Sequence, residues 1–153
     1  MVDLNVIPKG NKFVVLDQKE RTIYTIKTGM GGKTHLINSG GYKLFHFTCD
    51  KKAKKPVFTV YNDDKVMFTA ECTSLFLEPG IAVRGERANL DVVSHDRQEF
   101  KIMDGENQIG TVTSQEEKKE TRYLIEIDEN HFDDYIPLIA VFIDMSFGKI
   151  NKG

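Results

Sequence analysis

Tryptophan is absent from this sequence of 153 residues, whose aromatic residues are ten phenylalanines and five tyrosines. Proteins that bind single-stranded nucleic acid combine aromatic stacking platforms with a basic groove. Here the formal net charge is −2, so the chain as a whole has no electrostatic attraction to nucleic acid. We therefore expect no nucleic-acid partner.

Cysteine is scarce as well, with only Cys49 and Cys72. Each stands alone in a stretch typical of a strand, so we expect buried free thiols; a disulfide and a reactive thiol are the alternatives. None of the four histidines is paired with another histidine or a cysteine at the spacing of zinc ligands. The sequence therefore predicts no metal and no cofactor.

Long apolar runs are also missing. The most continuous one, Tyr135 to Phe147, has 13 residues, whereas a helix that spans a bilayer needs about 20. Asp134 directly before this run and Gly148 directly after it are typical of a helix start and a helix end, which predicts a helix from about residue 134 to 147. Pro137 fits the first turn of such a helix.

The predicted helix has no polar face, and a helix that is apolar on every side is buried on every side. We therefore predict a structural core helix, with a membrane tail anchor as the alternative. The expected core residues are Leu138, Ile139, Val141, Phe142 and Met145. The first residues lack the basic and apolar regions of a signal peptide, so we expect no transmembrane segment and a cytoplasmic protein that can be peripheral to a membrane.

Upstream of the helix, turn residues separate about eleven short stretches of strand-like sequence. These are residues 12–16, 22–27, 34–37, 42–48, 57–61, 66–70, 81–85, 90–93, 99–103, 108–113 and 123–128. Residues 115–120 are predicted to be a charged loop. Only a closed barrel can enclose a helix that is apolar on every side, which predicts a mainly β protein, a closed antiparallel barrel around its C-terminal helix. No linker divides the chain, so residues 1–153 are expected to form one domain with its core at about 12–148.

Three stretches resemble the LURP-one-related family, which belongs with the tubby C-terminal-like domains and the phospholipid scramblases. They are residues 13–17 with 23–27, residues 99–105 with 108–112, and the run from Asp134 to Asp144. The resemblance implies a twelve-stranded barrel around a central hydrophobic helix. It also implies a link to lipids, since tubby domains bind phosphoinositides through basic side chains on the barrel surface. No tubby lipid-contacting pair and no scramblase calcium loop matches positions here.

The sequence contains no catalytic signature. Ser94, His95 and Asp96 near Asp91 lack the nucleophile-elbow context of an activated serine, so a solvated turn is expected. The glycines of residues 29–32 lack the spacing of a phosphate-binding loop, which favours a connection between strands.

One basic loop is the candidate binding patch, formed by Lys51, Lys52, Lys54 and Lys55. Each lysine near an anionic surface contributes about 1 kcal/mol of binding, and the alternative is a solvated loop whose charges discourage aggregation. Arg84 and Arg87 form a smaller basic pair.

The leading functional hypothesis is therefore a non-catalytic binding module for an anionic lipid headgroup, a membrane surface or a protein partner. The alternatives are a small-ligand carrier or enzyme that uses a cavity at the barrel mouth, and a structural interaction domain. The absence of a catalytic constellation and the family resemblance support the first.

Overall fold

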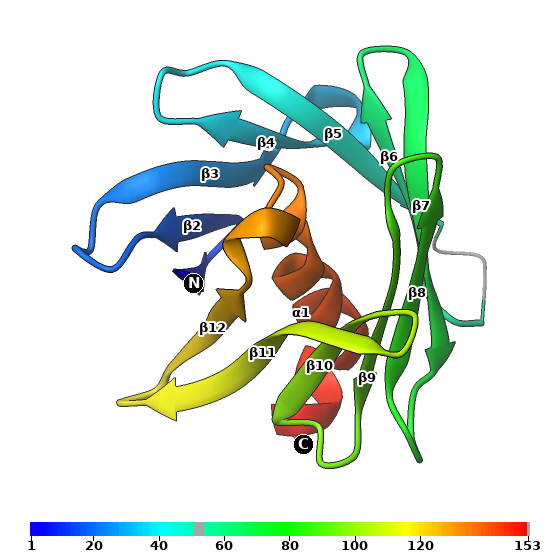
Figure 1. Cartoon of the computed structure of the whole chain (residues 1–153). Coiled ribbons are helices and arrows are strands. Elements are labelled where there is room, and N and C mark those ends of the chain that lie inside the picture. Colours follow the sequence, from blue (N-terminus) through cyan, green and yellow to red (C-terminus); the bar gives the residue numbers. More distant parts are fainter. Residues whose placement is uncertain (51–53, 153) are drawn as a thin grey trace.

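Twelve antiparallel strands close into a barrel around one helix in the computed structural model, which describes residues 1–50 and 54–152 (Figure 1). The strands are β1 (Val2–Lys9), β2 (Lys12–Leu16), β3 (Thr22–Thr28), β4 (Thr34–Asn38), β5 (Lys43–Asp50), β6 (Val57–Asn62), β7 (Lys65–Ser74), β8 (Gly80–Gly85), β9 (Asn89–Ser94), β10 (Glu99–Asp104), β11 (Asn107–Glu117) and β12 (Glu120–Ile127). Each strand pairs with the next in the sequence, and β1 pairs with β12 to close the ring. The predicted fold class is confirmed.

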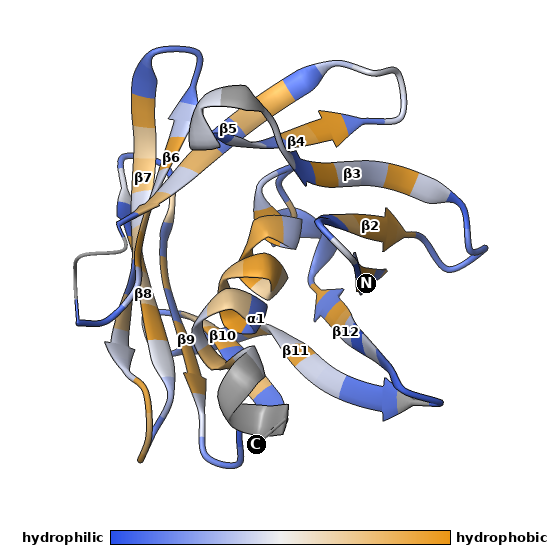
Figure 2. Ribbon diagram, turned by 180° about the vertical axis from the view of Figure 1, so that it is seen from behind, coloured by the Kyte–Doolittle hydropathy of each residue, from blue (hydrophilic) through white to orange (hydrophobic). Residues whose placement is uncertain are grey.

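Alternation along the strands builds the barrel interior. In β6, for example, Phe58 and Val60 are buried whereas their neighbours are partly exposed, because successive side chains of a strand point to opposite faces. Figure 2 shows the same alternation of apolar and polar bands along the ribbons. The inward row of every strand therefore faces the helix.

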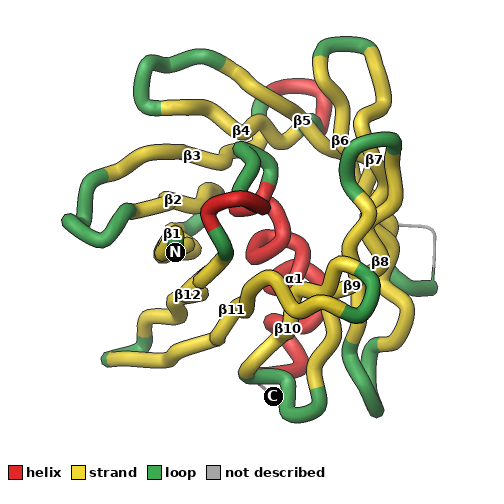
Figure 3. Tube along the Cα trace, in the orientation of Figure 1, coloured by secondary structure: helices red, strands yellow, loops and turns green. Residues whose placement is uncertain are grey.

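The helix α1 (Ile136–Lys152) runs through the barrel, with strands on all sides of it in Figure 3. Leu138, Ile139, Val141 and Phe142 are at most 1% exposed. The ring of Phe142 stacks on Phe58 at a centroid distance of 4.4 Å, so at this level side chains fill the barrel interior. Two short 3₁₀ helices, η1 (Met30–Gly32) and η2 (Glu129–His131), lie in connections.

Met145 differs from the sequence prediction. Its side chain is 46% exposed, so it does not fill the barrel interior. The next residues, Ser146 and Phe147, are buried, so solvent reaches the later turns of α1 from one side only.

Both ends of the helix are also shifted from the prediction, since α1 begins at Ile136 and continues past Gly148 to Lys152. Asp134 accepts a hydrogen bond from the phenol of Tyr24 on the barrel wall. At Gly148 a Cβ atom would lie 2.9 Å from the Asp144 carboxylate, so this glycine provides space inside the helix and does not end it. Pro137 lies in the first turn, as predicted.

The strand β1 was not predicted. Its residues Leu4 and Val6 are buried, and its pairing with β12 ends at Val6, before Pro8. A proline is tolerated there because no β12 residue needs its missing N–H group.

The predicted charged loop at residues 115–120 is also wrong. In the structure β11 and β12 pair as far as Glu117 and Glu120, and only Lys118 and Lys119 form the turn. Both lysines have positive φ angles, 50° and 70°, as tight hairpin turns with the right-handed strand twist require. Lysine carries no sequence signal for such a turn, so the prediction failed.

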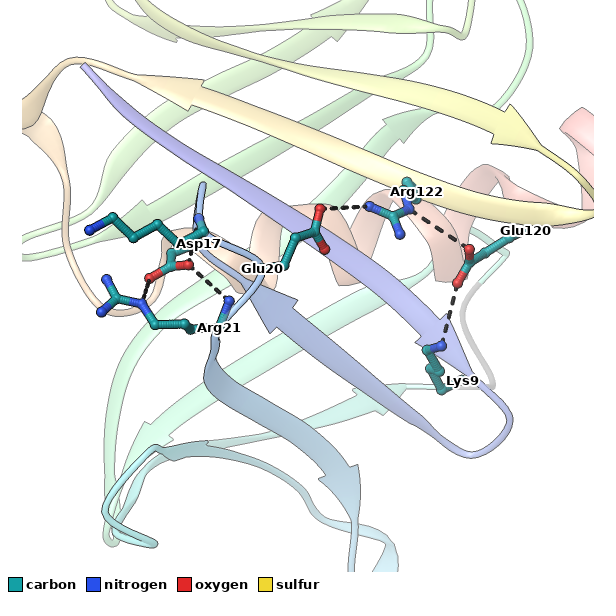
Figure 4. A network of polar contacts seen from close by, with 7 residues as sticks. Lys9, Asp17, Glu20, Arg21, Glu120 and Arg122 are labelled. Atoms are coloured by element: carbon teal, nitrogen blue, oxygen red, sulfur yellow. Dashed lines mark hydrogen bonds and ion pairs between the residues drawn. The ribbon is translucent and has the colours of Figure 1, made fainter.

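Ion pairs cross the seam where β1 meets β12 (Figure 4). Glu120 lies 3.4 Å from Lys9 and 3.8 Å from Arg122, and Arg122 is also 3.6 Å from Glu20. These side chains are at least partly exposed, so each pair adds little to stability and the network mainly fixes the seam geometry.

Candidate functional site

Three loops meet at one end of the barrel, and we call residues 54–56, 75–79 and 95–98 the loop end. Main-chain hydrogen bonds attach two of them to neighbouring strands: the Pro56 carbonyl accepts from Cys72 N–H of β7 at 3.0 Å, and the Pro79 carbonyl accepts from Ser94 N–H of β9 at 3.0 Å. The side chain of Lys55 donates to the Thr73 carbonyl at 2.9 Å. The loop end is therefore a joined surface built from distant parts of the sequence.

The β7–β8 loop presents two adjacent apolar side chains to solvent. Phe76 is 67% exposed and Leu77 is 90% exposed, the highest value among the large hydrophobic residues that the structure describes. Single exposed apolar residues are common, but a contiguous pair at a loop tip is typical of an interaction site.

Arg97 of the β9–β10 loop fixes this tip. Its guanidinium donates to the carbonyl groups of Leu75 and Phe76 and lies 5.6 Å from the centroid of the Phe76 ring. The aromatic ring is thus held beside a cation while most of it remains exposed.

The turn that carries Arg97 is itself well defined. The Ser94 hydroxyl donates to the Glu99 carbonyl at 2.7 Å and accepts from Arg97 N–H at 2.9 Å. The Asp96 carboxylate accepts from the N–H groups of Glu99 and Gln98, both at 2.9 Å, and these hydrogen bonds hold its pKa below the usual range. Arg97 therefore approaches the β7–β8 loop from a fixed backbone.

Charges of both signs surround the apolar tip. Lys54 and Lys55 are exposed on one side, while Glu78 lies 3.7 Å from His95 on the other. Asp96 is turned towards its own backbone by its hydrogen bonds. The lysine side of the tip is thus the side that complements an anionic surface.

Of the four lysines predicted as a patch, Lys51 and Lys52 lie outside the residues that the structure describes. Lys54 and Lys55 are exposed at the loop end. Sequence analysis missed Phe76, Leu77 and Arg97. The sequence does contain one indication of this site: Phe76 and Leu77 directly precede the turn Glu78-Pro79-Gly80, where loop residues are usually polar.

The Ser94 hydroxyl lies 3.4 Å from the Asp96 carboxylate, but the residues considered as a nucleophilic set are engaged in other contacts. Ser94 and Asp96 are engaged in the turn described above, and Asp91 lies 2.6 Å from the guanidinium of Arg84. Arg84 also donates to the Leu90 carbonyl at 2.8 Å, so its guanidinium links β8 to β9.

Neither Cys49 nor Cys72 forms a disulfide in the part of the chain that the structure describes. Cys72 is buried, and this burial raises the pKa of its thiol, whereas Cys49 is partly exposed. Across the residues that the structure describes, no group of three or more histidine, cysteine, aspartate or glutamate side chains is placed to hold a metal ion.

A cleft of about 380 Å³ lies at the barrel mouth where α1 begins. Its histidine, His131, lies 3.9 Å from the Asp104 carboxylate and 3.7 Å from the Asp128 carboxylate, so each ring nitrogen has a carboxylate neighbour. Tyr135 closes the inner side of the cleft, and burial raises the pKa of its phenol to about 12.

A closed antiparallel barrel with a buried C-terminal helix and a joined set of loops at one end defines the structural class. Residues 4–144 match the model of the LURP-one-related family, and the chain belongs to that family. No curated protein matches the chain.

The fold is also similar to the X-ray structure of a protein from Arabidopsis thaliana. The TM-score is 0.63 with 13% sequence identity, over 98% of this chain and 91% of that one. This likeness shows the fold alone. Among the described residues, no helix has the length and apolar character needed to cross a bilayer.

Proposed function

We propose that the protein is a non-catalytic module that binds anionic membrane surfaces through its loop end. In this proposal Phe76 and Leu77 enter the boundary between headgroups and acyl chains, while Lys54 and Lys55 face lipid phosphates. The observation that carries the proposal is the adjacent pair of exposed apolar side chains beside Lys55 and Arg97.

The expected energies suit reversible binding. Burying a phenylalanine or leucine side chain contributes about 1.5–3 kcal/mol, and each lysine near an anionic surface contributes about 1 kcal/mol. The apolar part is independent of salt, whereas the lysine part weakens as ionic strength rises. Peripheral membrane proteins typically combine two such contributions to binding, the insertion of apolar side chains and electrostatic attraction to anionic lipids.

Co-sedimentation with vesicles tests the proposal. The vesicles contain phosphatidylcholine alone or with phosphatidylserine, at low and at near-physiological salt. We expect binding to the mixed vesicles, weakened by salt. The double variant Phe76→Ser/Leu77→Ser should lose most of this binding, and Lys54→Gln/Lys55→Gln should bind less and respond less to salt.

The matched control is Lys19→Gln/Lys65→Gln, which removes two exposed lysines, one in the β2–β3 turn and one at the start of β7. Because consecutive strands are antiparallel, both positions lie at the opposite end of the barrel from the β7–β8 loop in Figure 1. This variant should bind like the wild type. If the wild type does not sediment with either vesicle, or if the control falls as much as Lys54→Gln/Lys55→Gln, the proposal is wrong. A protein partner would then be the better hypothesis.

A further inference from the structure

A second surface lies on the barrel wall, away from the loop end. Lys27, His35, His46 and Tyr61 occupy directly opposite positions on β3, β4, β5 and β6. The rings of His35 and His46 are 5.6 Å apart, and His46 stacks on Tyr61 at 4.8 Å with nearly parallel planes. Side chains opposite one another on paired strands contact on one face, so these four form a continuous row.

A cleft of about 420 Å³ lies over the two histidines. The exposed Lys33 and Lys43 line one part of it, and Asp63 and Asp64 of the β6–β7 turn line another. Lysine and histidine side chains therefore approach the same space from β4 and from β5.

The protonation of the histidines reflects these neighbours. Partial burial, followed by the charge of Lys43, lowers the pKa of His35, with smaller effects of His46 and Lys33. Partial burial and Lys33 lower the pKa of His46, against the opposing effect of Asp64 and Asp63. Near neutral pH the two rings are therefore mostly uncharged, and the ammonium groups of Lys33 and Lys43 repel any proton added to His35.

We propose that this cleft binds a single phosphate monoester group, held by Lys33 and Lys43 with His35 and His46 as hydrogen-bond donors. A phosphate monoester carries close to two negative charges and three strong acceptor oxygens, which suits two ammonium groups and two imidazoles. The carboxylates of Asp63 and Asp64 disfavour more highly charged polyanions at the same place.

The sign of the proton linkage follows from the charges. The bound phosphate places negative charge beside the rings and raises the pKa of both histidines, since an opposite charge favours the protonated form. Binding therefore takes up protons between the lower pKa of the free protein and the higher pKa of the complex. Affinity should rise as the pH falls through this interval, until the phosphate itself is protonated near its second pKa of about 6.

The test follows the ring C–H resonances of all four histidines by NMR during pH titration of the full chain, at constant ionic strength. The probes are inorganic phosphate and glycerol 3-phosphate, with chloride as the reference. We expect the pKa of His35 and of His46 to rise by about 1 in phosphate. His95 and His131 lie outside the cleft and serve as internal controls.

The variant Lys33→Gln/Lys43→Gln should lose this response, whereas Lys118→Gln/Lys119→Gln should keep it. Dispersed amide spectra show that each variant is folded. If His35 and His46 shift no more than His95 and His131 with any probe, the proposal is wrong.

A further arm adds vesicles that contain phosphatidic acid, whose headgroup is a phosphate monoester. A response to glycerol 3-phosphate in solution supports a soluble ligand, and a response to these vesicles alone supports a lipid headgroup. The variant Phe76→Ser/Leu77→Ser should keep its response to glycerol 3-phosphate, so this site and the loop end can be tested separately.

Discussion

At the scale of single residues, the apolar helix is positioned by two polar contacts with the barrel wall. The Tyr123 phenol donates to the Asp144 carboxylate at 2.5 Å in the middle of the helix, and the Tyr24 phenol donates to Asp134 just before the helix begins. Burial and the adjacent carboxylate raise the pKa of both phenols, so they remain protonated donors at any physiological pH. These contacts fix the rotation of a helix whose apolar surface alone gives no unique orientation.

Removing one phenol tests this role. Tyr123→Phe leaves the partly buried Asp144 carboxylate without its donor, and we expect the free energy of unfolding to fall by about 1–3 kcal/mol. Urea denaturation monitored by circular dichroism measures the change. Tyr42→Phe is the control, because Tyr42 is 72% exposed, and it should leave stability unchanged. Equal stability of Tyr123→Phe and the wild type would contradict the positioning role.

These contacts also show where residue-level sequence analysis failed. Asp134 and Gly148 are typical residues of a helix start and a helix end, and the prediction used them in that way. In the structure Asp134 binds Tyr24, and Gly148 makes room for the Asp144 carboxylate. The sequence alone does not show whether such a residue caps the helix or makes a long-range contact, because both roles use the same residue types.

At the scale of elements, α1 is the core of the barrel. Phe142 lies between Phe47, at a centroid distance of 5.1 Å and nearly perpendicular, and Phe58, which it stacks on. The ring of Phe147 stacks on Phe100 further along the helix at 5.5 Å. Such pairs stabilise the packing beyond the burial of aromatic surface, so Phe142 and Phe147 are expected to contribute strongly to the core.

Two substitutions in the same helix should therefore differ widely. Phe142→Ala removes a fully buried ring and should lower the free energy of unfolding by about 3–5 kcal/mol. Met145→Ala removes a side chain that is 46% exposed and should cost less than about 1 kcal/mol. Thermal and urea denaturation of the two variants give the comparison. Similar losses at the two positions would show that the helix is not enclosed as the structure indicates.

Most strands and the helix were predictable because each is marked by a local pattern in the sequence. Alternating strands, the Asp104-Gly105 turn and a terminal run without a polar face together predicted a closed barrel around its helix. The failures at β1 and at the Lys118–Lys119 turn have a common cause. In both places the pairing partner determines the conformation, since β1 is stabilised by the distant β12 and the turn by the long pairing of β11 with β12.

At the scale of the whole molecule, the barrel assembles a surface from loops that are far apart in the sequence. Lys55, Phe76 and Arg97 are separated by about twenty residues each, yet Lys55 and Arg97 both bind carbonyl groups around the β7–β8 loop. The sequence located the lysines because they are clustered along the chain. The apolar tip and its arginine could not be assigned without knowing which loops meet.

The most direct test of the membrane proposal uses the absence of tryptophan from the chain. Phe76→Trp introduces a single fluorescent reporter at the loop tip, and Tyr42→Trp places a matched reporter at the β4–β5 turn. Because consecutive strands are antiparallel, that turn lies at the opposite end of the barrel from the β7–β8 loop. Both native side chains are exposed aromatic rings, with exposed fractions of 67% and 72%.

Emission is recorded with phosphatidylserine-containing vesicles and with vesicles whose acyl chains carry bromine as a quencher. We predict that the emission of Phe76→Trp shifts to shorter wavelength and is quenched by the brominated chains, while that of Tyr42→Trp changes in neither respect. No response at position 76, or an equal response at position 42, would contradict docking through the loop end.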